Sequence, residues 1–303
     1  MAAPELVLTL VGNAPLSAPT IDVARAALSD AGATIGTIKA LGEDAGDIAF
    51  NGIDELAAEQ AVRNALNGAQ VDLLAQDADP AQRRKQLLIA DMDSTMITAE
   101  CLDELADFAN MKDEVVAITE RAMRGELDFE EALDARIAML ADKGLTEDSL
   151  EACYQDRIRL SDGARTTVRT MANNGAHTAL VSGGFTFFTE RVGAALGMAE
   201  NRANTLVFNA DKMLEKVARP ILGKAAKQAA LEEMCATHNI ALTQAIAIGD
   251  GANDLAMIGV AGLGVAYRAK PVVAEAARAR LDHAPLTGLL YFQGYTTDQF
   301  TID

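Results

Sequence analysis

The chain of 303 residues has no tryptophan and few residues of the types that build disulfide frameworks or histidine-based catalytic centres. Its only cysteines are Cys101, Cys153 and Cys235, and its only histidines are His177, His238 and His283. The cysteines are far apart and in no CxxC spacing, which predicts free thiols in a reducing cytoplasm. The histidines also stand apart, so a Ser-His-Asp or Cys-His catalytic unit is hard to build unless folding gathers them.

Basic residues are scarce relative to acidic ones. There are 26 Lys and Arg against 44 Asp and Glu, which gives a net charge of −18. Such a chain repels polyanions, so we expect no nucleic-acid partner and no anionic membrane partner. No apolar run reaches membrane-spanning length, and the start "MAAPELVLTLVG" lacks the basic region of a signal peptide. We therefore expect a cytoplasmic protein.

Half of the residues are hydrophobic, and the length suits about two domains. Residues 1–78 read in the order β-α-β-β-α-β, with strands near 6–11, 34–41, 48–50 and 71–76 and helices near 21–31 and 54–68. This order predicts a small ferredoxin-like α+β domain. It also resembles, weakly, the ACT-type modules that bind amino acids.

The composition changes after this first domain. Residues 79–85 are polar, contain Pro80 and turn from acidic to basic, which predicts a separable linker. Four continuous apolar runs then follow within residues 86–303: "QLLIAD", "AHTALVSGG", "AIAIGDG" and "GLGVAY". Runs that are apolar throughout are typical of parallel strands covered on both faces, so we expect an α/β, doubly wound, Rossmann-like sheet.

A long helical stretch at about 99–160 separates the first of these strands from the next helix of the repeat. Four successive segments in it have helical periodicity, and none reads as a strand. A connection of this length exceeds an ordinary crossover. We expect it to form a helical cap over the carboxyl edge of the sheet.

Polar residues and glycines follow three of the predicted strands. The first strand ends in "DMDST" from Asp91, the second in "SGG" from Ser182, and the third in "GDGAND" from Gly249. Ligands of open α/β sheets bind outside the carboxyl ends of the strands, so these residues should converge on one crevice. Carboxylates without His or Cys favour a hard cation such as Mg²⁺.

Taken singly, these motifs are weak. A lone DxD after a strand is more often a turn, "SGG" is almost uninformative, and Lys227 alone would be a solvated helix lysine. Together they supply a cation site, backbone N–H groups for an anion, a positive charge and a spare carboxylate. That set is suited to phosphoryl transfer, with one carboxylate as the nucleophile and a second handling the proton of the leaving group.

The four motifs "DMDST", "VSGG", Lys227 and "GDGANDLAM" resemble those of the haloacid dehalogenase superfamily of phosphatases. Over about residues 86–290 the chain is similar, more narrowly, to the phosphoserine phosphatase family within it. The segments that carry this resemblance include "DSTMITAECLDELA", "AMRGELDFEEALDARIAML" and "VSGGFTFFTERVGAALGM". Met92 and Met96 stand where many relatives have Phe or another apolar residue, which is a conservative difference.

The resemblance implies a role for each matching residue. Asp91 would be the nucleophile, and Asp93 would protonate the leaving serine and then activate water. Mg²⁺ would be held by Asp91, Asp250 and the backbone carbonyl of Asp93. The phosphate would be bound by Ser182, Gly183, Lys227 and Asn253, with Asp254 orienting Lys227 or metal-bound water. Glu100 and Arg136 would bind the ammonium and carboxylate of phosphoserine, and Met123 and Phe129 would close the pocket.

Without the resemblance, Glu100 and Arg136 would be read as solvated or salt-bridged helix residues, and Met123 and Phe129 as packing within the cap. Two other interpretations of the function stay open: a phosphatase of this superfamily acting on another small phosphate ester, and a regulatory amino-acid-binding protein. The N-terminal domain itself could either join two chains into a homodimer or sense an amino acid, and the sequence favours dimerisation.

Overall fold

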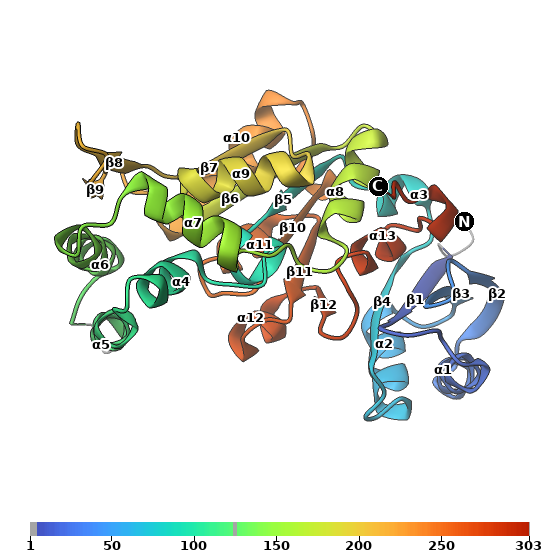
Figure 1. Ribbon diagram of the computed structural model, residues 1–303. Helices are drawn as coiled ribbons and strands as arrows, with labels where there is room; N and C mark the ends of the chain where they lie inside the picture. Colours follow the sequence, from blue (N-terminus) through green and yellow to red (C-terminus); the bar gives the residue numbers. More distant parts are fainter. Residues whose placement is uncertain (1–4, 124–125, 303) are drawn as a thin grey trace.

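A computed structural model describes residues 5–123 and 126–302, and Figure 1 shows its parts side by side. The N-terminal part has four antiparallel strands and two helices: β1 (Leu6–Gly12), α1 (Ala18–Asp30), β2 (Thr34–Ala40), β3 (Ala45–Asn51), α2 (Glu55–Ala65) and β4 (Val71–Asp77). The strand order is β2-β3-β1-β4, which is the ferredoxin-like arrangement expected from the sequence.

The N-terminal core follows from the two-residue period of its strands. Leu8 and Leu10 of β1 point to one face of the sheet and pack with Ala24 and Leu28 of α1 and with Phe50 of β3. Ser17 caps α1 by accepting a hydrogen bond from the Thr20 N–H, and Asp54 caps α2 in the same way. Ala58 and Val62 of α2 belong to the same core as the α1 residues, so both helices cover the same face of this sheet.

A second sheet of six parallel strands forms the centre of the larger part. Its order is β12-β11-β10-β5-β6-β7. The strands are β5 (Leu87–Ala90), β6 (His177–Phe185), β7 (Glu200–Asn204), β10 (Ala245–Gly249), β11 (Leu263–Tyr267) and β12 (Ala279–Leu281). The four central strands are those expected from the sequence, and the parallel α/β class is confirmed. Sequence reasoning missed the edge strands β7 and β12, because "ENRAN" is polar and "ARL" is only three residues long.

Helices cover both faces of this parallel sheet. Leu88 and Ala90 of β5 face one core together with α8 (Ala164–Asn173), α9 (Thr186–Leu196) and α13 (Gly288–Phe292). Leu87 and Ile89 face the other core with α10 (Lys224–Thr237), α11 (Leu255–Val260) and α12 (Pro271–Ala276). Among the described residues, no helix combines the length and the apolar character needed to cross a membrane.

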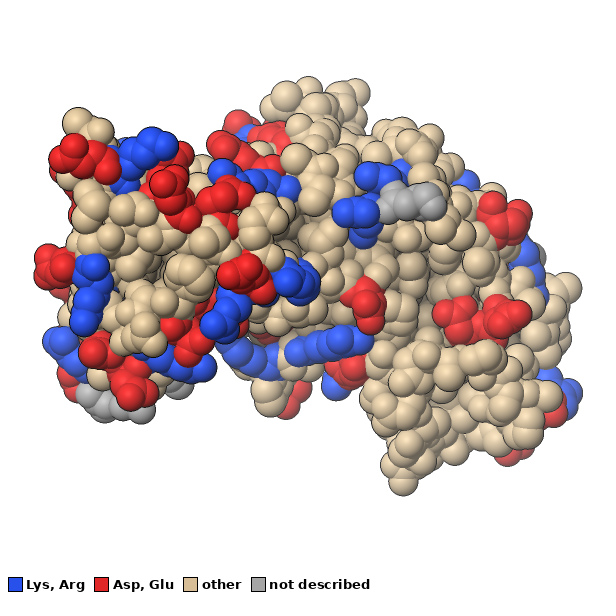
Figure 2. Space-filling view, in the orientation of Figure 1, with Lys and Arg blue, Asp and Glu red and all other residues tan. Residues whose placement is uncertain are grey.

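Four helices occupy the stretch between β5 and α8: α4 (Cys101–Phe108), α5 (Lys112–Met123), α6 (Phe129–Asp142) and α7 (Glu147–Arg157). They lie at the left of Figure 1, away from the N-terminal part. A small hairpin, β8 (Leu206–Phe208) with β9 (Leu214–Val217), packs against α6. Figure 2 shows charged side chains dense over these helices and sparse on the visible face of the N-terminal part.

The segment expected to be a linker is ordered and partly buried. Pro80–Arg83 form the short helix α3, and the Arg83 side chain is buried between the two parts. Its guanidinium donates to both Asp47 carboxylate oxygens at 2.7 and 3.2 Å, to Thr9 Oγ1 at 3.0 Å, and to the Tyr291 and Phe292 carbonyls. Arg83 therefore joins the N-terminal sheet to α13 of the larger part, which contains the parallel sheet.

Two further polar contacts cross the same boundary. The carboxylate of Asp72 in β4 accepts hydrogen bonds from the backbone N–H groups of Asp282, His283 and Ala284, at 2.8–3.0 Å. Arg278 donates to Glu59 of α2 at 2.7 Å. A chain truncated near Ala81 would lose the partners of these groups, so the structure does not favour an easily separable N-terminal part.

Replacing Arg83 by Ala should destabilise the whole protein, because it leaves the Asp47 carboxylate buried without its ion-pair partner. The expected loss is about 3–5 kcal/mol in the free energy of unfolding, measured by urea denaturation. Arg25→Ala is the matched control: its ion pair with Asp22 is exposed, so its effect should stay within about 0.5 kcal/mol. Equal stability of the two variants would contradict a structural role for the Arg83 contacts.

Candidate active site

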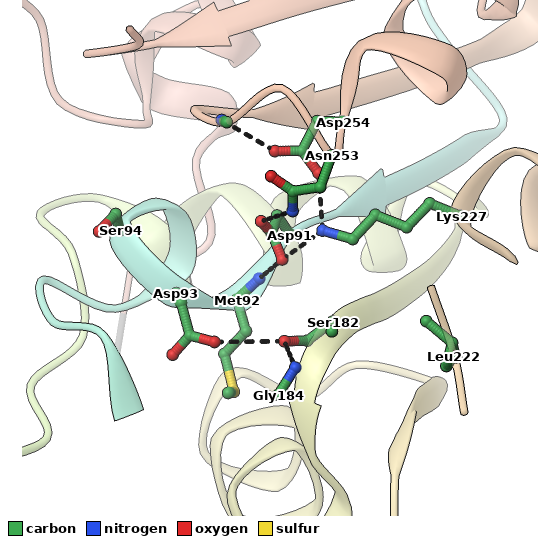
Figure 3. Close-up of polar contacts among 12 residues, drawn as sticks. Asp91, Met92, Asp93, Ser94, Ser182, Gly184, Leu222, Lys227, Asn253 and Asp254 are labelled. Carbon is green, nitrogen blue, oxygen red and sulfur yellow. Dashed lines mark hydrogen bonds and ion pairs between the residues drawn. The ribbon is translucent and has the colours of Figure 1, made fainter. Parts of the chain in front are cut away.

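The chain leaves β5 through a tight loop that turns the first two acids toward the carboxyl edge of the sheet. Asp91 has extended backbone, and its Oδ1 accepts a hydrogen bond from the N–H of Met92 at 2.8 Å. Ser94 has a φ of 53°, so the backbone reverses within the motif. This loop brings the carboxylates of Asp91 and Asp93, labelled in Figure 3, to the lining of one pocket.

A buried lysine lies between two of the predicted acids. Lys227 of α10 is 1% exposed, and its Nζ is 2.6 Å from both Asp91 Oδ1 and Asp254 Oδ1 (Figure 3). Burial by itself lowers the pKa of an ammonium, but the two carboxylates outweigh it and raise the pKa of Lys227 above its ordinary value. Lys227 is therefore a fixed positive charge against the Asp91 carboxylate.

The loop after β10 holds Asp254 in place through close backbone approach. A side chain at Gly249 would lie 2.3 Å from the Asp254 carboxylate, so only glycine fits there. Asp254 Oδ2 accepts from the N–H of Gly251 at 3.0 Å, while Asn253 Nδ2 lies 3.4 Å from Asp91 Oδ2. The "GDGAND" loop thus brings the Asn253 amide next to Asp91 and holds Asp254 against Lys227.

Asp93 is connected to the last residues of β6. Ser182 Oγ donates to Asp93 Oδ2 at 3.3 Å and accepts from the Gly184 N–H at 2.9 Å (Figure 3). The N–H of Cys101 donates to the other Asp93 oxygen at 2.9 Å. Burial, followed by the neighbouring charges of Glu100 and Asp91, raises the pKa of Asp93 to about 7. A carboxyl with such a pKa is suited to giving and taking a proton near neutral pH.

Three carboxylates gather close enough to share a cation. One oxygen from each of Asp91, Asp250 and Asp254 lies within 4.8 Å of the others, and all three residues are buried. Burial, and then the charge of Asp91, raises the pKa of Asp250 to about 6. Both Asp254 oxygens already have partners, Lys227 Nζ and the Gly251 N–H, and Asp254 does not line the pocket, whereas Asp91 and Asp250 do. Asp91 and Asp250 are therefore the carboxylates better placed to hold a metal ion. All donors are oxygens, which fits a hard divalent cation.

The sheet edge and the cap enclose one pocket of about 470 Å³. The residues of the predicted site that line it are Asp91, Asp93, Glu100, Phe129, Arg136, Ser182, Gly183, Lys227, Asp250 and Asn253. Asp254 lies beneath it, fully buried. The side chain of Met123, also expected here, lies outside the described residues. The structure thus brings together side chains that are up to 162 residues apart in the chain.

The cap places opposite charges at the mouth of the pocket. Glu100 accepts from Ser94 Oγ at 2.6 Å, and the Arg136 Nε donates to the Ala132 carbonyl of its own helix at 3.0 Å. Burial lowers the pKa of Arg136, against the opposing charges of Asp103 and Glu100. No hydrogen bond within the described part of the chain engages the Arg136 Nη atoms. Arg136 therefore retains donors for a ligand.

Phe129 begins α6 and covers the glycines of the pocket floor. A side chain at Gly183 would lie 3.7 Å from Phe129 Cζ, and one at Gly223 would lie 3.8 Å from Phe129 Cδ1. Phe129 is 38% exposed, which is high for a large apolar side chain. It therefore provides an apolar wall at the pocket entrance.

Sequence reasoning gave no role to two further residues of this region. Lys270, after β11, lines the pocket, and its N–H donates to the Asp250 carbonyl at 3.1 Å. Asn204, at the end of β7, is 2% exposed and bonds the Gly183 carbonyl at 2.9 Å and the Leu222 N–H at 2.6 Å. Lys270 follows a strand that the sequence reveals, so its position near the site could have been predicted. Asn204 is the last residue of an edge strand that the apolar pattern does not reveal.

Comparisons with known proteins agree with this geometry. Residues 88–259 match the family model of the haloacid dehalogenase-like hydrolases. The phosphoserine phosphatase of Streptomyces coelicolor is 36% identical over 299 residues, which cover 96% of this chain and 71% of that protein.

Solved structures show a similar arrangement. A probable phosphoserine phosphatase of Vibrio cholerae, in its unliganded form, is 28% identical with a TM-score of 0.77, and the match covers 98% of this chain and 88% of that one. A phospho-aspartyl intermediate analogue of a phosphoserine phosphatase is 35% identical with a TM-score of 0.62, over 69% of this chain and 99% of the other. The chain therefore belongs to the haloacid dehalogenase-like hydrolase family.

Proposed function

We propose that this protein hydrolyses O-phosphoserine to serine and phosphate through an aspartyl-phosphate on Asp91. The observation that carries the proposal is the arrangement of Asp91 at the base of the pocket. One carboxylate oxygen is fixed by Lys227 and the Met92 N–H, and Asp93, with a raised pKa, lines the same pocket. The names of the relatives, phosphoserine phosphatases, support the same substrate.

The proposed chemistry has two steps. An Asp91 oxygen attacks phosphorus, the bond from phosphorus to the serine oxygen breaks, and Asp93 gives its proton to that oxygen. Water then attacks the phosphoryl group, Asp93 takes a proton from this water, and the phosphorus–oxygen bond to Asp91 breaks. Ser182, Gly183, Lys227 and Asn253 would bind the phosphoryl oxygens during both steps, which supplies positioning and charge stabilisation.

A divalent metal ion is general among phosphatases of this family, and we propose Mg²⁺ here. Asp91, Asp250 and the backbone carbonyl of Asp93 would hold it. When bound, the ion would neutralise the charge of the phosphate and of the crowded carboxylates. The raised pKa of Asp250 fits this role, because its burial and the neighbouring charge of Asp91 outweigh the opposing charges of Lys270 and Lys227.

Recognition of serine would come from the cap. The ammonium of phosphoserine would pair with Glu100 and its carboxylate with Arg136, whose planar guanidinium suits a carboxylate. Phe129 would exclude water at the entrance.

The runner-up is another small phosphate ester with the same chemistry, such as phosphothreonine or a sugar phosphate. The homodimer and the cytoplasmic location stay predictions; the three buried free thiols suit a reducing compartment.

Asp91→Asn should reduce steady-state turnover by a factor of roughly 10³ or more, because an amide cannot form the acyl-phosphate. The measurement is phosphate release from phosphoserine, with deamidation excluded by mass spectrometry. Asp113→Asn is the matched control, since Asp113 is exposed at the start of α5 and should keep normal activity. Appreciable turnover by the Asp91→Asn variant in its undeamidated form would rule Asp91 out as the nucleophile.

Removal of divalent metal with EDTA should abolish activity, and excess Mg²⁺ should restore it. Ca²⁺ should not, since its longer bonds and looser coordination misplace the phosphorus against the nucleophile. Initial rates on phosphoserine in each condition, with circular dichroism to confirm folding, make the test. A metal-free protein that keeps its full rate would contradict the proposed metal site.

Phosphoserine should be hydrolysed faster than phosphothreonine, sugar phosphates and a simple alkyl phosphate. Arg136→Lys keeps the charge but loses the planar fork, so kcat/KM for phosphoserine should fall roughly tenfold or more, or about 1.4 kcal/mol. The alkyl phosphate, which has no carboxylate, should be little affected.

The control for this variant is Arg121→Lys, at an exposed arginine of α5 whose Nε lies 3.3 Å from Glu126. It should leave both substrates unchanged. If Arg136→Lys slows both substrates equally, Arg136 supports catalysis or structure in general and the proposed substrate contact is wrong. If the protein prefers another ester of the panel, that ester replaces phosphoserine as the proposed substrate, and the proposed role of Asp91 still stands.

A further inference from the structure

Two of the three histidines, which stand apart in the sequence, meet a glutamate on the surface of the fold. His177 begins β6, Glu200 begins β7, and His238 caps the carboxyl end of α10. The two imidazole rings stack with their centroids 3.9 Å apart, and His177 Nε2 lies 3.4 Å from Glu200 Oε2. One ligand atom from each residue lies within 4.8 Å of the others.

This cluster lies at the amino ends of the strands, whereas the catalytic pocket lies at their carboxyl ends. Ser182 lies five residues along β6 from His177, which is roughly 16 Å of strand. Lys227 lies eleven residues along α10 from His238, which is also roughly 16 Å of helix. The cluster therefore shares no ligand with the acids of the catalytic pocket.

The carboxylate of Glu200 is oriented by a second partner. Its Oε1 accepts from Arg202 Nε at 2.6 Å, which leaves Oε2 on the side of the histidines. Arg202 is itself fixed by Glu233 of α10, at 2.8 Å. Ligands of protein-bound metals are commonly held by such outer hydrogen bonds. His238 is exposed, so solvent and ions can reach the cluster.

The chemistry of this donor set differs from that of the catalytic pocket. Two neutral imidazoles and one carboxylate suit a borderline transition-metal ion, with water as a further ligand, whereas the all-oxygen pocket suits Mg²⁺. Protonation of both stacked rings would place two positive charges against each other. A single divalent ion instead satisfies both nitrogens and the free Glu200 oxygen together.

We propose that His177, Glu200 and His238 bind one zinc-type divalent ion, at a second metal site separate from the catalytic pocket. Bound there, the ion joins the end of α10 to the starts of β6 and β7. Because α10 also carries Lys227, the site tethers the helix that supplies the buried cation of the pocket. It needs small movements of the exposed His238 ring to bring the three ligand atoms to bonding distance.

The test is a Zn²⁺ titration of the full chain, free of any polyhistidine tag and held in saturating Mg²⁺, by isothermal calorimetry and equilibrium dialysis. The wild-type protein should bind one Zn²⁺ equivalent that His238→Ala loses or binds at least roughly tenfold more weakly. Glu200→Gln should weaken the same equivalent. His283→Ala is the matched control and should bind as the wild type does, because His283 lies beside Asp72 at the boundary with the N-terminal part and is not a member of the His177–Glu200–His238 cluster.

Histidine side-chain NMR of the wild-type protein gives a readout that needs no variant. Zn²⁺ should shift the imidazole resonances of two histidines and leave the third unchanged. Equal Zn²⁺ binding by the wild type and a folded His238→Ala protein would overturn the proposal, as would equal losses in His238→Ala and His283→Ala. Unshifted imidazole resonances at saturating Zn²⁺ would also overturn it, and would leave two stacked histidines, one of them hydrogen-bonded to Glu200, without a metal.

Discussion

The arrangement of the catalytic pocket depends on one buried ammonium, that of Lys227. Asp91 and Asp254 come from the ends of two adjacent parallel strands, and their carboxylates would repel each other in the interior of the protein. Lys227 lies 2.6 Å from both, so the three groups form a chain of alternating charge. The favourable charge interactions raise the pKa of the lysine despite its burial. The proposed nucleophile is thereby fixed in position, while Asp250 and Asp93 remain for a metal ion and a proton.

The pocket is made by two parts of the fold with different tasks. The sheet edge supplies Asp91, Ser182 and Asp250, whose positions are set by backbone hydrogen bonds between strands. The cap supplies Glu100, Phe129 and Arg136 from helices inserted after the first strand. Because the proposed reacting groups lie on the sheet and the proposed specificity groups lie on the cap, changes in the cap can alter the substrate without altering the chemistry.

The N-terminal part is attached by buried polar contacts rather than by a flexible tether. Arg83 and Asp47 are each under 10% exposed, and Asp72 receives three backbone N–H groups from the catalytic part. Contacts of this kind are costly to break singly, because each leaves a buried charge or donor without a partner. They reach the larger part through residues 278–293, which include β12, the last strand of the parallel sheet in chain order. The proposed zinc-type site lies elsewhere on the same sheet, at the starts of β6 and β7.

The sequence by itself determined the α/β class, the central strands, the ferredoxin-like order and the polar residues at the strand ends that line the pocket, Asp91, Asp93, Ser182 and Asp250. These follow from apolar periodicity and from polar residues placed directly at strand ends, which are local signals. The tertiary structure alone decided the burial of Arg83, the edge strands with Asn204, and the meeting of His177 with His238. Each depends on contacts between segments distant in the chain, and a polar residue has the same local pattern whether its partner is water or a side chain brought to it by folding.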